Sequence, residues 1–145
     1  RESPKTDVLT EPSSDGDPNG VEQLMRIHRM KTGALITASL EMGAAVAQAA
    51  PEIRQRLRKY GECCGLAFQI ADDLLDVTGI GTRMGKETGR DQELGKLTYP
   101  ALLGIEGSRR RARELVEEAC ECLSVLKTRA EPLRQLAQFI VERDH

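Results

Sequence analysis

The feature of this 145-residue sequence that most restricts its fold is an apolar stripe at helical spacing. Between Pro51 and Val77, apolar residues return at steps of three and four, which places them on one face of an α-helix. The members of this stripe are Ile53, Leu57, Tyr60, Cys64, Ala67, Phe68, Ala71 and Leu75. Pro51 suits the first turn of such a helix, because the N–H that proline lacks would have no partner there. The sequence therefore predicts one long helix with a buried face.

The same spacing recurs on both sides of this helix. One long helix or two abutting helices are predicted from Val21 to about Ala50, with a buried face formed by Leu24, Ile27, His28, Leu35, Ile36, Leu40, Ala44 and Ala47. A helix after Pro100 would bury Leu102, Ile105, Ala112, Leu115, Val116, Ala119, Leu123 and Leu126. Pro132 is expected to open a last helix with Leu136, Phe139 and Ile140 on its inner face. No segment alternates with the period of a strand, so the predicted fold is all-α, an antiparallel helical bundle.

Two segments lack this periodicity. Residues 1–20 are rich in Pro, Ser, Asp and Gly and are expected to form a flexible loop or arm, which leaves residues 21–145 as the helical unit. Five glycines between Gly79 and Gly95 predict largely irregular backbone. Inside the long helix, Gly61 and Gly65 stand four residues apart and would let another helix approach closely. We interpret this pair as a packing feature.

Composition excludes several classes of function. The net charge of −2 provides no general attraction for nucleic acid or an anionic membrane. No apolar run is long enough for a membrane span and no leader opens the chain, so a cytoplasmic location is expected. The four cysteines occur as Cys63-Cys64 and Cys120-x-Cys122, which fits neither a CxxC redox motif nor a zinc site. They are expected to be buried or neutral thiols.

The segment FQIADDLLDV at residues 68–77 has the clearest chemical content. In a helix Asp72 and Asp76 stand one turn apart on one face, with Asp73 beside them. Like charges this close need a positive partner, and Mg²⁺ prefers oxygen ligands and bridges carboxylates to phosphates. The alternative is a solvated acidic patch, but the apolar residues just before the acids favour a buried helix that ends at a cavity.

A set of lysines could supply the matching charge for a phosphate. Lys31 precedes Thr32, and the pairs Gly85-Lys86 and Gly95-Lys96 place lysines on backbone that is free to close over an anion. Each lysine alone is more simply interpreted as a surface residue. Acids that suit a metal and cations that suit a phosphate occur here in one small unit. This combination is a more specific indication of a diphosphate site than either set alone.

Three segments carry a family resemblance: HRMKTGALI at 28–36, GLAFQIADDLLDVTG at 65–79 and MGKETGRDQELGKLTYPALLG at 84–104. They resemble, in order, the carboxy-terminal motifs of the polyprenyl synthetase family, the trans-prenyltransferases that make farnesyl and geranylgeranyl diphosphate. The resemblance covers about residues 21–145 and implies the carboxy-terminal part of the isoprenoid synthase fold. It also implies condensation of an allylic diphosphate with isopentenyl diphosphate, through Mg²⁺-assisted ionisation, attack by the double bond and loss of a proton.

The resemblance implies a role for each matched residue. Asp72, Asp73 and Asp76 correspond to the second aspartate-rich motif, which holds Mg²⁺ against the allylic diphosphate. Lys31, Lys86 and Lys96 correspond to the lysines that grip that diphosphate. Thr32, Phe68 and Gln69 would line the substrate cavity, where Thr32 and Gln69 stabilise the allylic cation.

The match lacks two elements of the family. The family's first aspartate-rich motif and its basic site for isopentenyl diphosphate have no counterpart here, because the sole similar element, Asp15-Gly16-Asp17, lies in the arm. We therefore expect a truncated portion of a synthase that is inactive alone. Its uncovered apolar faces are expected to lead to self-association, as a homodimer or by a swap of helices with a second copy. Product length is set near the missing motif, so the sequence does not define it.

Two other functions remain open at this stage. The chain could be a non-catalytic regulatory subunit that pairs with a complete synthase, although the intact DDLLD and Gly-Lys pairs oppose that reading. It could also be a helical interaction module that uses the basic run Arg109, Arg110, Arg111 and Arg113. A solvated helix face explains this run better, because Glu114, Glu117 and Glu118 follow at helical spacing and can pair with it.

Overall fold

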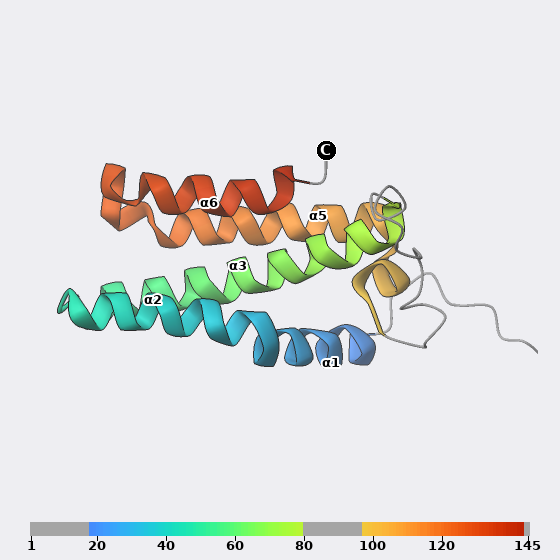
Figure 1. The fold of residues 1–145 in the computed structure, drawn as a ribbon, viewed down its shortest axis with the longest axis horizontal. Coiled ribbons are helices and arrows are strands. Elements are labelled where there is room, and N and C mark those ends of the chain that lie inside the picture. Colours follow the sequence, from blue (N-terminus) through green and yellow to red (C-terminus); the bar gives the residue numbers. More distant parts are fainter. Residues whose placement is uncertain (1–17, 80–96, 144–145) are drawn as a thin grey trace, which may run out of the picture.

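The structure is a computed structural model that describes residues 18–79 and 97–143. Every regular element in these ranges is helical: α1 (Pro18–His28), η1 (Arg29–Gly33), α2 (Ala34–Val46), α3 (Pro51–Thr78), α5 (Tyr99–Cys122), η3 (Ser124–Ala130) and α6 (Glu131–Glu142). The long helices run back and forth alongside one another (Figure 1). The prediction of an all-α bundle is confirmed.

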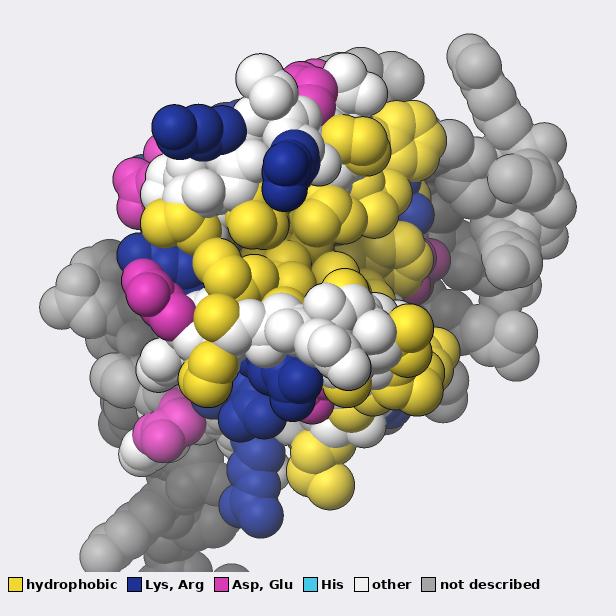
Figure 2. All heavy atoms as spheres, turned by 90° about the vertical axis from the view of Figure 1, so that its left-hand side faces the viewer, with side chains coloured by type: hydrophobic (Ala, Val, Ile, Leu, Met, Phe, Trp, Pro, Cys, Tyr) yellow, Lys and Arg dark blue, Asp and Glu magenta, His cyan; other side chains and the backbone are white. Residues whose placement is uncertain are grey.

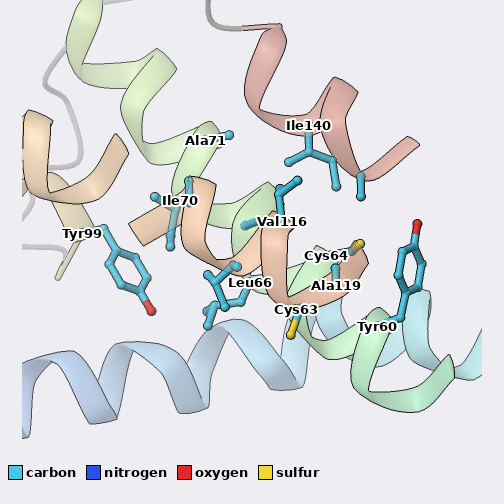
Figure 3. Close-up of a cluster of buried hydrophobic side chains, with 14 of the residues drawn as sticks. Tyr60, Cys63, Cys64, Leu66, Ile70, Ala71, Tyr99, Val116, Ala119 and Ile140 are labelled. Carbon is cyan, nitrogen blue, oxygen red and sulfur yellow. The ribbon is translucent and has the colours of Figure 1, made fainter. Parts of the chain in front are cut away.

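Helix α3 is the centre of the molecule. Pro51 occupies its first turn, as predicted, and the helix packs most extensively against α5 and then against α2. Its buried side comprises Tyr60, Gly61, Cys63, Cys64, Gly65, Leu66, Ala67, Ile70, Ala71, Asp73 and Leu74. Figure 3 shows several of these side chains meeting Val116 and Ala119 of α5 and Ile140 of α6. Of the predicted stripe, four residues are buried and four are half-buried. The buried ones are Tyr60, Cys64, Ala67 and Ala71, and the half-buried ones are Ile53, Leu57, Phe68 and Leu75.

The first helical stretch is bent where the sequence predicted either one helix or two. Residues Arg29–Gly33 form a π-helical turn, and Lys31 has non-helical backbone angles of φ −88° and ψ −107°. Beside this turn α3 comes very close, because a Cβ placed on Gly65 would lie 2.5 Å from the Gly33 Cα atom. A Cβ on Gly61 would lie 3.0 Å from the Thr37 Cα atom. The interpretation of the glycine pair as a close-packing feature is confirmed.

The cysteines and the basic run also agree with prediction. All four cysteines are free, and burial raises the pKa of the Cys63 thiol to about 11 and that of Cys64 to about 12. Arg111 forms ion pairs with Glu114 at 3.2 Å and with Glu118 at 3.3 Å along α5. Arginine and glutamate thus pair on one helix face, as expected for a solvated surface.

Several predicted core positions are exposed, and for these residues the prediction is wrong. Leu35 is 71% exposed, Leu136 55% and Phe139 60%, while Ile27, Ala47 and Ile105 are also exposed. Amphipathic spacing identifies the apolar face of a helix, but burial also requires another element to cover it. The first three residues instead line an open groove of about 570 Å³ between α2, α3 and α6. Figure 2 shows hydrophobic side chains gathered between charged ones at the end where α2 meets α3.

Parts of the prediction lie outside the described residues. These are residues 1–17 of the expected arm and residues 80–96, with Lys86 and Lys96. Helix α1 already begins at Pro18, three residues before the expected start of the helical unit. None of the described helices combines the length and the hydropathy that crossing a lipid bilayer requires.

Candidate functional site

Two of the predicted motifs meet where η1 lies against α3. The Thr32 hydroxyl donates a hydrogen bond of 3.2 Å to Oε1 of Gln69, across 37 residues of sequence. Both side chains are half-buried. The close approach of Gly33 to Gly65 explains this contact, because only backbones without side chains between them can come so near. The structure therefore brings Thr32 of the segment 28–36 together with Gln69 of the segment 65–79.

The three aspartates have different environments. Asp72 and Asp76 are exposed, one turn apart near the carboxyl end of α3, whereas Asp73 is buried with 8% of its surface exposed. The backbone N–H of Tyr99 donates to Oδ2 of Asp73 at 3.2 Å. Asp73 thus binds the start of α5, while Asp72 and Asp76 face solvent. Across residues 18–79 and 97–143, no three His, Cys, Asp or Glu side chains are grouped as a metal site would require.

The donors at this helix end nevertheless fit part of a magnesium site. Two exposed carboxylates stand at the carboxyl end of α3, where the aligned peptide dipoles add partial negative charge. Such a place favours a cation. Mg²⁺ commonly takes one or two carboxylates from a protein and completes its shell with water and phosphate oxygens. Asp72 and Asp76 are therefore suitable ligands, and Asp73 is less so because Tyr99 already engages it.

Lys31 lies in the η1 turn, which packs against α3. Its side chain is exposed, and its non-helical backbone angles redirect the chain at the η1 turn. One turn earlier, His28 is buried, and burial together with the charge of Lys31 lowers the histidine pKa to about 4. His28 is therefore neutral near pH 7, and the positive charge here belongs to Lys31. An exposed lysine suits the binding of an anion from solvent.

Phe68 links the candidate site to the apolar groove. Its half-buried ring lines the groove one turn before Asp72 on α3. The guanidinium of Arg143 lies 4.3 Å from the centre of the ring, a cation–π contact. Phe68, which the family resemblance assigns to the substrate cavity, thus borders an apolar surface.

One residue of this region, Tyr99, was not predicted from sequence to be functional. Tyr99 is 1% exposed and its ring centre lies 5.5 Å from that of His28. The burial of Asp73, which Tyr99 engages, had a signal in the sequence. Leu66, Ile70 and Asp73 share the i, i+4, i+7 stripe, so Asp73 belongs to the buried side of the helix.

Comparison with known proteins identifies the family of the chain. The chain matches the polyprenyl synthetase family over residues 6–132, and it belongs to that family. It is 44% identical over 139 residues to the farnesyl diphosphate synthase of Escherichia coli (strain K12), a match that covers 90% of this chain and 45% of that protein.

Solved structures give the same result. An apo FPP/GFPP synthase from Zymomonas mobilis superposes with a TM-score of 0.70 at 39% identity, covering 83% of this chain and 38% of that one. A geranyltransferase from Helicobacter pylori, complexed with magnesium and isoprenyl diphosphate, has a TM-score of 0.65 at 33% identity, covering 85% and 40%. The chain therefore spans less than half the length of the relatives it matches.

Proposed function

We propose that this chain supplies the half of a trans-prenyltransferase site that holds the allylic diphosphate, and that it corresponds to the carboxy-terminal half of its relatives. The observation that carries the proposal is the contact between Thr32 and Gln69. It places the turn with Lys31 beside the helix with Asp72. A phosphate-binding cation and metal-binding acids would thus face one substrate.

The reaction proposed for the whole enzyme joins an allylic diphosphate to isopentenyl diphosphate. The allylic C–O bond breaks and pyrophosphate leaves; the double bond of isopentenyl diphosphate then forms the new C–C bond, and a proton is lost. Mg²⁺, when bound, would neutralise charge on the leaving diphosphate.

The residues of this chain contribute binding and electrostatics to that reaction. Lys31, with Lys86 and Lys96, is proposed to hold the diphosphate oxygens, and Asp72 and Asp76 to hold the metal. The Gln69 side chain accepts a hydrogen bond from Thr32, which fixes its orientation. The fixed amide and hydroxyl dipoles are proposed to stabilise positive charge on the allylic carbon. Phe68 is proposed to contact the hydrocarbon chain.

The chain alone is proposed to transfer no prenyl group. Its sequence has no second helical aspartate-rich motif, and the Asp15-Gly16-Asp17 element lies outside the described residues. The exposed apolar residues of the groove support self-association as a homodimer. A cytoplasmic location is also part of this proposal.

Calorimetric titration of variants with inorganic pyrophosphate, at saturating Mg²⁺, tests the assignment. Asp72→Asn and Lys31→Gln each remove one charge from the proposed site, and each is expected to weaken binding by about tenfold or more. Glu52→Gln and Lys59→Gln are matched controls, because both alter exposed charges on α3 far from its carboxyl end. Equal affinity in the site variants and the controls would contradict the proposal.

A further inference from the structure

Tyr99, in the first turn of α5, contacts both motif-bearing segments of the candidate site. Its backbone N–H donates to Oδ2 of Asp73 at 3.2 Å, which joins it to the acidic end of α3. The adjacent residue Asp72 is exposed and carries the proposed metal-binding carboxylate. The backbone of Tyr99 therefore ties down the helical turn that presents Asp72.

The side chain of Tyr99 contacts the segment that leads to Lys31. Its ring lies 5.5 Å from the ring of His28, centre to centre, with the planes inclined by 32°. Only 1% of Tyr99 and 6% of His28 is exposed. His28 is the last residue of α1, directly before the π-helical turn that contains Lys31. Figure 3 shows the Tyr99 ring reaching from the start of α5 toward α1.

The hydrogen bond between Asp73 and Tyr99 is of a kind that resists displacement. A buried carboxylate that loses a hydrogen bond pays a desolvation cost, so the bond between Asp73 and the Tyr99 amide resists breaking. The amino end of α5 also carries partial positive charge, which favours a carboxylate there. Thr98 caps the same turn by accepting a bond of 3.3 Å from the Ala101 N–H. The start of α5 is therefore fixed, and the ring contact with His28 is fixed with it.

We propose that Tyr99 is a positioning residue that sets the distance between Lys31 and the carboxylates of Asp72 and Asp76. This inference rests on the proposed function, because it assigns Tyr99 to the same diphosphate site. Tyr99 itself touches no substrate; it acts through His28 on one side and through Asp73 on the other. A core tyrosine would contribute stability alone, whereas a positioning tyrosine also couples the lysine half of the site to the acidic half.

A double-mutant cycle separates these two roles. The Kd of inorganic pyrophosphate at saturating Mg²⁺ is measured for the 145-residue chain, for Tyr99→Leu, for Lys31→Gln and for the double variant. Relative placement matters only while both halves of the site are present. Tyr99→Leu is therefore expected to weaken binding by about tenfold in the wild-type background and by less than about twofold in the Lys31→Gln background. Tyr99→Phe, which keeps the ring and the backbone N–H, is expected to bind as the wild type does.

Each outcome has a defined meaning. Equal losses from Tyr99→Leu in both backgrounds, or a loss from Tyr99→Phe as large as that from Tyr99→Leu, would overturn the positioning role while leaving the proposed function intact. No magnesium-dependent binding by the wild type would overturn both. Circular dichroism establishes that each variant is folded at the assay temperature. If Tyr99→Leu does not fold, His28→Leu removes the same ring contact from the other side and is expected to give the same non-additive result with Lys31→Gln.

Discussion

The backbones of α3 and η1 approach each other very closely at Gly65 and Gly33. A Cβ at position 65 would lie 2.5 Å from the Gly33 Cα atom and 3.2 Å from the Gly33 N atom. Ordinary contact between carbon atoms begins at about 3.5 Å, so Gly65→Ala requires α3 and the η1 turn to separate by about 1 Å. Both atoms belong to the backbone, so no side chain can rotate away.

The energy follows from two opposing effects. Overpacking costs about 1–3 kcal/mol, and the separation would also lengthen the hydrogen bond between Thr32 and Gln69. Alanine gains about 1 kcal/mol over glycine in helix propensity. With about 1 kcal/mol more lost from the loosened hydrogen bond, we expect Gly65→Ala to lower the free energy of unfolding by about 2 kcal/mol. Gly43→Ala is the matched control, because nothing lies within 4 Å of its added Cβ in α2, and it should stabilise the chain by about 0.5–1 kcal/mol.

Urea denaturation followed by circular dichroism measures both variants. We expect opposite shifts of the urea midpoint, which should be lower for Gly65→Ala and higher for Gly43→Ala. Gly65→Ala should also weaken magnesium-dependent pyrophosphate binding, since Thr32 and Lys31 move with Gly33. A higher midpoint in both variants would refute the close approach of η1 to α3.

Two further predictions concern buried polar groups. Burial, with the Lys31 charge, lowers the pKa of His28 from 6.5 to about 4, so the unfolded chain binds a proton more readily and stability falls as the pH drops below 6.5. Wild type should lose about 2 kcal/mol more than His28→Gln between pH 7 and pH 5 in urea titrations, and parallel losses would contradict the neutral histidine. The Tyr60 hydroxyl donates to the Leu133 carbonyl oxygen at 2.7 Å and joins α3 to α6. Tyr60→Phe should lower the free energy of unfolding by about 1–2 kcal/mol, and an unchanged urea midpoint would argue against this bond.

The helices could be predicted because their causes are local. Apolar spacing and the proline at position 51 define α3, and the same signals define α6. The π-helical turn at Lys31 has no comparable signal, because it arises where η1 fits against the glycines of α3. Exposure of Leu136 and Phe139 was likewise not predictable, since their helix has a clear apolar face and burial depends on a covering element.

In the candidate site, too, some features could be predicted from the sequence and others depend on tertiary packing. The motif residues were identified from sequence, and the contact between Thr32 and Gln69 places two of the motifs together. The three aspartates were treated as one cluster, because adjacent acids look alike in a motif. Asp73 lies about 100° around the helix from Asp72, on the side that faces the start of α5. The partner of Asp73 is the backbone N–H of Tyr99, 26 residues away. Nearly every residue has a backbone N–H, so the sequence does not indicate which one Asp73 will bind.

The Lys31 turn and the acidic end of α3 are proposed to form a half-site for a magnesium-bound diphosphate. Calorimetric titration of the unmodified chain with inorganic pyrophosphate, with and without Mg²⁺, tests this half-site. We expect saturable binding of pyrophosphate that requires Mg²⁺. Absence of binding, or the same affinity with and without Mg²⁺, would contradict it.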